Sequence, residues 1–265
     1  MMSNNYFADY HTHTNHSGDS KYKMEQVVKD AIKLGIDELC FTDHVDYRKI
    51  SSAPNFKKYF AEIEHMQDKY GDSINIKKGL EFGMQTHTVQ KYEAIIAKYP
   101  LDFIILSVHQ INNQGLWGRV YQKGKTKFEY VQGYYQEILD LITMYDDYSV
   151  LGHLDLIRRY CDGPEPVLAD HQEIVAEILK IVIKKERGIE LNTSHIRYGL
   201  DDWMPSRDIL ELYHDLGGKI ITMGSDAHEK EHLGFYLKEG RALLKEIGFT
   251  EFCTFDKMQP KFHRL

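Results

Sequence analysis

Residues 6–13 read Tyr6-Phe7-Ala8-Asp9-Tyr10-His11-Thr12-His13, a short apolar run that ends in two histidines. Such a run favours a buried strand. Side chains two positions apart on a strand point to the same side of it, so His11 and His13 can bind one metal ion together. The pair therefore predicts a metal site at the end of the first strand.

Several later apolar runs end in a histidine or a carboxylate in the same way. They are Phe41-Thr42-Asp43-His44, Gly79-Leu80-Glu81, Leu106-Ser107-Val108-His109, Leu151-Gly152-His153 and Gly224-Ser225-Asp226-Ala227-His228. One such ending has little meaning alone. A series of them indicates a single site that is built from the ends of successive strands.

Strand-like and helix-like segments alternate along the chain. Strands are predicted at 6–12, 38–43, 74–80, 102–108, 148–152, 188–192, 219–224 and 249–255, and helices at 24–34, 56–71, 88–98, 127–145, 168–186, 205–216 and 238–247. Gly35 is the expected C-cap of the first helix, Gly71 is expected to end the second, and Pro205 is expected in the first turn of the sixth.

This alternation predicts an α/β fold with parallel strands and right-handed crossovers. Seven or eight such units in this length favour a closed barrel over an open sheet. Barrel sites lie at the C-terminal ends of the strands, where the histidines and carboxylates fall. The sequence shows no linker and no internal repeat, so we expect one domain over residues 1–265.

Composition narrows the class of protein. The chain has 265 residues, 42% hydrophobic and 28% charged, with a net charge of -7. An acidic surface does not favour nucleic acid or anionic lipid as a partner. Cys40, Cys161 and Cys253 are too few and too scattered for a disulfide framework or a metal motif, which favours a reducing compartment. Residues 1–5 show no signal peptide and no uncharged run suits a membrane span, so a cytoplasmic location is expected.

The predicted ligands also indicate which metals bind. Imidazole together with carboxylate suits Zn, Fe or Mn. A catalytic zinc needs only three protein ligands, so the set is too rich for one ion and predicts two or three. Glu81 is the expected bridge, because it is the strand-end carboxylate without a histidine nearby. The full set is His11, His13, His44, Glu81, His109, His153, Asp226 and His228.

These motifs resemble those of a known family. The strings DYHTH, FTDH, GLEFG, SVH, GHLD and GSDAH are similar to those of the PHP (polymerase and histidinol phosphatase) superfamily of metal-dependent phosphoesterases. The opening DYHTHTNHSGDS, the arginine after GHLD and the closing GFTEFCTF resemble its histidinol-phosphate phosphatase branch. The resemblance implies a distorted (β/α)7 TIM-like barrel that holds three divalent metal ions.

Carried over by position, the resemblance implies a ligand set for each ion. The first ion takes His11, His13, Glu81 and Asp226, the second takes Glu81, His109 and His153, and the third takes Asp19, His44 and His228. Asp19 lies in a loop, and His16 nearby is an alternative that stays open. Asp226, Glu81 and His228 are the expected catalytic residues, and either Asp226 or a water on the third metal would protonate the leaving group.

A phosphate substrate also needs cationic donors. Arg158 and Arg159 follow the GHLD motif, and Arg197 follows another strand end. Arginine binds phosphate oxygens bidentately, so Arg159 and Arg197 are the predicted ligands, with Arg158 as the alternate. His195 is a further candidate for substrate binding. The segment 112–127 is basic and aromatic, which suits an exposed loop, a lid over the phosphate or a nucleic-acid contact.

We therefore expect a phosphatase that hydrolyses L-histidinol phosphate to L-histidinol and phosphate in histidine biosynthesis. The expected partner is a small phosphorylated substrate, with no nucleic acid and no membrane, and the sequence does not predict an oligomeric state. A phosphodiesterase or exonuclease of the same superfamily, or a general small-molecule phosphatase, is the alternative. A non-enzymatic metal-binding module is a rival from another class.

Overall fold

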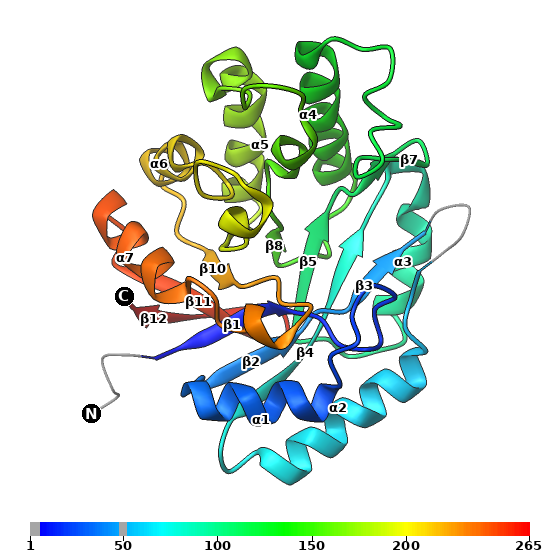
Figure 1. The fold of residues 1–265 in the computed structure, drawn as a ribbon, viewed down its shortest axis with the longest axis vertical. Helices are drawn as coiled ribbons and strands as arrows, with labels where there is room; N and C mark the ends of the chain where they lie inside the picture. The colour runs from blue at the N-terminus through cyan, green and yellow to red at the C-terminus, as the bar shows by residue number, and fades with distance from the viewer. Residues whose placement is uncertain (1–5, 48–51) are drawn as a thin grey trace.

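Seven parallel strands form the wall of a barrel in the computed structural model, which describes residues 6–47 and 52–265. The expectation about a signal peptide concerns residues 1–5, which lie outside the described residues. The strands follow one another in chain order, which confirms the (β/α)7 barrel that the family resemblance implies (Figure 1). They are β1 (Ala8–Thr12), β2 (Glu38–Phe41), β4 (Asn75–Gly83), β5 (Phe103–Ser107), β8 (Val150–Leu151), β9 (Gly188–Asn192) and β10 (Ile221–Gly224).

The barrel closes between its first and last strands. Thr12 forms a parallel bridge with Ala227, just after β10. The His13 N–H donates to the Ala227 carbonyl at 2.8 Å, and the Ala227 N–H donates to the His11 carbonyl at 3.2 Å. Closure therefore brings the residues that follow β1 directly beside those that follow β10.

Helices surround the strands on the outside (Figure 1). They are α1 (Met24–Leu34), α2 (Phe56–Tyr70), α3 (Val89–Ile96), α4 (Lys127–Met144), α5 (Gln172–Lys184), α6 (Arg207–Asp215) and α7 (Leu237–Ile247). In α1 the buried residues Met24, Val27, Val28 and Ala31 repeat at helical spacing. Gly35 ends this helix at φ 73°, a left-handed C-cap as predicted.

Short elements interrupt this pattern. The 3-10 helices are η1 (Thr86–Thr88), η2 (Leu156–Tyr160), η3 (Leu168–Asp170), η4 (His195–Tyr198) and η5 (Lys230–His232). The small strands β3 (His44–Asp46), β6 (Gln110–Ile111) and β7 (Gln114–Gly115) were not predicted. The predicted helix 168–186 is divided into η3 and α5. Pro205 lies two residues before α6 rather than in its first turn, because Ser206 is the N-cap.

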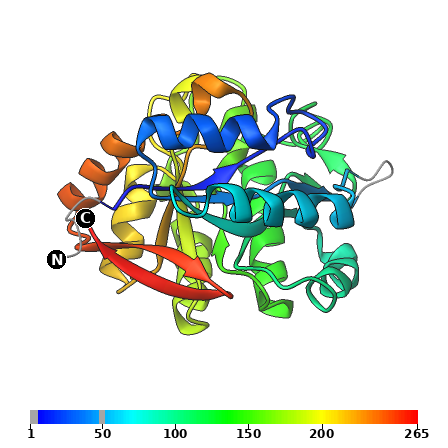
Figure 2. The same ribbon diagram turned by 90° about the horizontal axis from the view of Figure 1, so that it is seen from below.

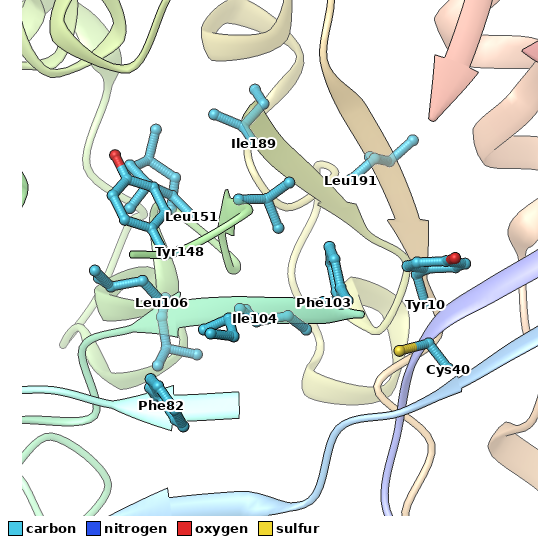
Figure 3. Close-up of a cluster of buried hydrophobic side chains, with 14 of the residues drawn as sticks. Tyr10, Cys40, Phe82, Phe103, Ile104, Leu106, Tyr148, Leu151, Ile189 and Leu191 are labelled. Atoms are coloured by element: carbon cyan, nitrogen blue, oxygen red, sulfur yellow. The ribbon is translucent and has the colours of Figure 1, made fainter. Parts of the chain in front are cut away.

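The apolar core consists of strand side chains and of helix side chains that pack against the strands. Figure 3 shows its side chains, with Tyr10, Phe103, Leu106 and Leu191 among them. The rings of Tyr10 and Phe103 pack edge to face, with centroids 4.9 Å apart. This packing fixes the strands whose C-terminal ends carry the predicted ligands.

The predicted strand 249–255 is present but does not belong to the barrel. It is β11 (Glu251–Asp256), which pairs antiparallel with β12 (Gln259–Arg264) in a separate hairpin (Figure 2). The Phe255 N–H donates to the Tyr10 hydroxyl at 2.7 Å, so the hairpin is bonded to the first barrel strand. Among the described residues, no helix has both the length and the apolar character to cross a membrane.

Candidate metal centre

The strand ends bring the predicted ligands together at one end of the barrel. Ligand atoms form four groups of three, and within each group all atoms lie within 4.8 Å of one another. The groups are His11, His13 and Asp226; His11, Glu81 and His153; His44, Glu81 and His109; and His13, His44 and His228. All eight ligands that the strand-end pattern predicts therefore belong to one cluster.

Glu81 lies at the centre of this cluster and is fully buried. Its Oε2 atom lies 3.3 Å from His11 Nε2 and 2.7 Å from His44 Nδ1. Its Oε1 atom lies 2.8 Å from His153 Nε2 and 3.1 Å from His109 Nε2. Two ligands of one tetrahedral ion lie roughly 3.3 Å apart when each bond is about 2.0 Å long. The geometry therefore suits a carboxylate shared between ions.

Two buried carboxylates lie behind the histidines and orient their rings. Glu190 Oε1 lies 2.6 Å from His11 Nδ1, and Asp46 Oδ1 lies 3.0 Å from His109 Nδ1. A carboxylate accepts the Nδ1–H and leaves the Nε2 lone pair available for a metal. The sequence analysis missed both acids. The signal for Glu190 was a charged residue between Ile189 and Leu191 in an apolar strand.

The ring of His13 is oriented in the same way by Ser17. Its Nδ1 atom lies 3.3 Å from Ser17 Oγ, and that hydroxyl donates to Asp43 Oδ1 at 2.7 Å. Because the serine proton is directed to Asp43, Ser17 Oγ accepts from the His13 Nδ1–H. Its Nε2 is thereby presented to the cluster.

Several properties of this donor set fit a metal. The Nε2 atoms of His11 and His13 are buried and have no hydrogen-bond partner among the described residues. A buried polar atom without a partner costs free energy, which coordination would offset. Burial and the neighbouring His228 and His44 hold the pKa of His13 well below its usual value, which favours the neutral, ligating form. The mixture of imidazole and carboxylate suits Zn, Fe or Mn.

The loop acid Asp19 reaches the cluster, whereas His16 does not. Asp19 Oδ2 lies 3.4 Å from His44 Nε2 and 3.6 Å from His228 Nε2. His16 Nε2 lies 2.8 Å from Glu62 Oε2 on α2 instead. Of the two alternatives left open by the sequence, the geometry favours Asp19.

The backbone at Asp226 is strained and is held from two sides. Its φ of 55° lies in the left-handed region that non-glycine residues rarely adopt. Asp9 accepts hydrogen bonds from the Ser225 N–H at 2.9 Å and from its hydroxyl at 2.5 Å. Arg197 donates to the carbonyls of Ser225 and Asp226, each at 2.9 Å. The predicted contact between Arg197 and phosphate stays a prediction. In the structure, Arg197 holds the loop that contains Ser225 and Asp226.

A cavity of about 430 Å³ opens onto the ligands. Arg159 enters it with a side chain that is 5% exposed. Its Nη2 atom donates to Asp226 Oδ2 at 3.2 Å and to Ser194 Oγ, and its guanidinium lies 3.8 Å above the Tyr198 ring. The cavity is lined by Gly18, Asp19, His44, Asp46, Ser52, His109, Trp117, His153, Leu156, Arg159, Tyr160, Tyr198, Asp226 and His228.

Arg158, next to Arg159 in η2, points elsewhere. Its guanidinium donates to Asp155 Oδ2 at 2.8 Å, to the Trp203 carbonyl at 2.6 Å and to Glu165 Oε2. The structure therefore gives no support to Arg158 as a phosphate ligand and favours Arg159 of the pair.

The other predicted substrate contacts are only partly at the cavity. His195 is buried, packs 4.4 Å from the Trp203 ring and does not line the cavity, so its role stays a prediction. From the segment 112–127, Trp117 lines the cavity and is 51% exposed. Arg119 of the same segment pairs with Asp162 on the surface.

Comparisons with known proteins agree with this geometry. A model of the PHP domain matches residues 9–194. The histidinol-phosphatase of Lactococcus lactis subsp. lactis is 34% identical over 256 residues, which cover 95% of each chain.

Solved structures agree as well. The crystal structure of histidinol phosphate phosphatase from Lactococcus lactis, complexed with zinc, L-histidinol and phosphate, has a TM-score of 0.88 at 32% identity. It covers 97% of this chain and 99% of that chain. A structure from Listeria monocytogenes shares the fold, with a TM-score of 0.76 at 20% identity over 87% of this chain and 99% of the other. This chain belongs to the PHP domain family.

Proposed function

We propose that the protein is a metal-dependent phosphatase that hydrolyses L-histidinol phosphate to L-histidinol and phosphate, a step of histidine biosynthesis. The observation that carries the proposal is the cavity itself, where a buried cluster of histidines and carboxylates meets the Arg159 guanidinium. The similarity over nearly the whole chain to an enzyme crystallised with zinc, L-histidinol and phosphate supports the substrate. We assign residues 1–265 to this one catalytic domain.

Three divalent ions, each zinc, iron or manganese, are proposed to bind. The first would be held by His11, His13, Glu81 and Asp226, the second by Glu81, His109 and His153, and the third by Asp19, His44 and His228. When bound, such ions polarise phosphoryl oxygens and supply hydroxide at neutral pH. The grouping of ligand atoms within 4.8 Å supports the placement of His11, His13 and Asp226 at one ion and the His44 and His228 pair at another. For the second set, the support is that Glu81 Oε1 lies 2.8 Å from His153 Nε2 and 3.1 Å from His109 Nε2.

The protein side chains have separate tasks in this proposal. Arg159 binds the phosphoryl oxygens and stabilises the charge that grows on them in the transition state. Glu81 holds the cluster together at its centre. Asp226 borders the cavity and would return a proton to the leaving alkoxide, whereas His228 would hold the third ion. The aromatic wall of Trp117, Tyr160 and Tyr198 is available to the organic part of the substrate.

The test is a substrate panel with zinc-loaded protein. Release of phosphate from L-histidinol phosphate is compared with release from serine phosphate, glycerol phosphate and nucleoside monophosphates. A site built for the substrate's polar groups is expected to give a kcat/KM ratio of at least about a hundredfold. A flat profile would indicate a general phosphatase, and preferential hydrolysis of bis(para-nitrophenyl) phosphate or single-stranded DNA would indicate a phosphodiesterase.

A further inference from the structure

Glu190 is a buried carboxylate behind the ligand cluster. It lies in β9, is 1% exposed, and contacts two proposed ligands from different strands. Oε1 lies 2.6 Å from His11 Nδ1, and Oε2 accepts the backbone N–H of His153 at 2.9 Å. The side-chain amide of Asn192 donates to the same Oε2 at 3.2 Å. One carboxylate therefore joins ligands assigned to the first and second ions.

Gly224 leaves the space that this carboxylate occupies. A Cβ added at Gly224 would lie 2.5 Å from Glu190 Oε1 and 2.4 Å from the His11 Cβ. A Cβ added at Gly152 would lie 3.6 Å from Glu190 Oε2 and 2.5 Å from Ser107 Oγ. The glycine of the GSDAH motif is thus explained in part by the need to seat Glu190 against His11, whereas Gly152 of the GHLD motif is required by Ser107 and Ile105.

The charge of Glu190 also needs a partner. Within residues 6–47 and 52–265, the ion-pair partner of Glu190 is His11, and no lysine or arginine pairs with it. A buried carboxylate is costly unless it is paired. An imidazole whose Nε2 faces a cation is such a partner, because the cation makes its Nδ1–H a stronger donor. The placement of Glu190 therefore points to the metal centre rather than to packing alone.

We propose that Glu190 is a positioning residue of the metal centre. It holds His11 as the Nδ1–H tautomer with Nε2 toward the first ion, and it ties the His153 backbone of the second site to the same carboxylate. The inference rests on the metal-dependent function proposed above. Its consequence is tighter metal binding without any contact to the substrate.

The direct test is Glu190→Gln in the full chain, which keeps the side-chain volume and removes the charge. Zinc affinity is measured by chelator competition and zinc content by elemental analysis. Loss of such a partner is expected to weaken zinc binding about 10- to 100-fold. We expect kcat to fall while KM changes by less than about threefold, and added zinc to restore part of kcat.

The matched control is Glu38→Gln. Glu38 is also a buried acid, 2% exposed, but its partners are Tyr6, Tyr10 and Asn75, none of which is a proposed ligand. This variant is expected to lower the melting temperature and to leave zinc affinity unchanged. Comparison of the two variants separates a metal-binding role from loss of a buried charge.

Glu190→Asp gives a second reading, because it keeps the charge and shortens the side chain by one methylene. Its zinc affinity is expected to lie between those of the wild type and Glu190→Gln. Wild-type zinc affinity and content in Glu190→Gln would overturn the proposal, and if that variant does not fold, wild-type affinity in Glu190→Asp would do so. Because zinc affinity is measured without substrate, failure of the wild type to hydrolyse histidinol phosphate would refute the proposed function alone.

Discussion

Replacement of Arg159 by lysine tests how the site binds phosphate. The arginine side chain is 5% exposed, bonds Asp226 and Ser194 through one nitrogen, and stacks 3.8 Å above Tyr198. Its Nε atom is buried and has no hydrogen-bond partner among the described residues. Lysine would keep the positive charge but would lose the planar stacking and the two-pronged contact with phosphoryl oxygens.

The expected loss follows from the contacts removed. A hydrogen bond to a charged group contributes about 1.5–3 kcal/mol. Losing one such bond to the phosphoryl group corresponds to a fall in kcat/KM of roughly 10- to 150-fold. Arg159→Met also removes the charge, and loss of a preorganised donor to the transition state costs roughly 100- to 1000-fold. The fall is expected mainly in kcat, since charge on the phosphoryl oxygens grows in the transition state.

The assay is phosphate release from L-histidinol phosphate at saturating zinc, with zinc content measured for each variant because Arg159 touches Asp226. Arg158→Lys is the matched control, since the neighbouring guanidinium binds Asp155 and Glu165 outside the cavity. This variant is expected to lower the melting temperature and to leave kcat/KM close to that of the wild type. Wild-type kcat/KM in Arg159→Lys, or a larger loss in Arg158→Lys, would show that the phosphate assignment is wrong.

Other predictions concern the ions and the hairpin. Glu81→Ala is expected to lower kcat more than Asp19→Ala, because Glu81 contacts ligands of two groups while Asp19 is 60% exposed at the rim; full activity in Asp19→Ala would contradict its role. A chelator is expected to abolish activity and to lower the melting temperature, and elemental analysis before chelation should approach three ions per chain. Lys77 and Lys261 lower the pKa of Asp256 to about 2 through hydrogen bonds. The stability from this group is therefore complete above the unfolded pKa of about 3.9 and is lost as pH falls through about 2. Asp256→Asn should reduce the free energy of unfolding by less than about 1 kcal/mol near pH 7, with a difference that shrinks below about pH 4; a constant difference in urea titrations would refute this.

The barrel could be predicted because its periodic signals are local. Met24, Val27 and Val28 mark one face of α1, and Gly35 marks its end. The hairpin could be predicted only in part. The apolar run of β11 indicates a strand, but its partner β12 is mostly exposed, and pairing with it depends on where the chain returns after α7.

The cluster of histidines and carboxylates could be predicted because its members end apolar strands. Asp19 lies in a loop where no periodic pattern applies, so only the family resemblance indicated it. Arg158 and Arg159 are adjacent in η2, and a sequence does not say which of two neighbours faces a cavity. Arg158 is directed away from the cavity because Asp155 and Glu165 bind its guanidinium.

The strand β9 shows that the site also depends on residues that are not proposed as ligands. Neither Glu190 nor Asn192 is a proposed ligand, yet β9 lies between β8 and β10, whose ends supply several. Residues two apart share a face of a strand, so both side chains are directed toward the same region. Glu190 contacts His11, and Asn192 accepts the Ser194 N–H at 3.1 Å. Because Ser194 in turn contacts Arg159, one strand connects His11, a proposed metal ligand, to the proposed phosphate ligand. Although β9 supplies no proposed metal ligand, its side chains therefore help to position both His11 and Arg159.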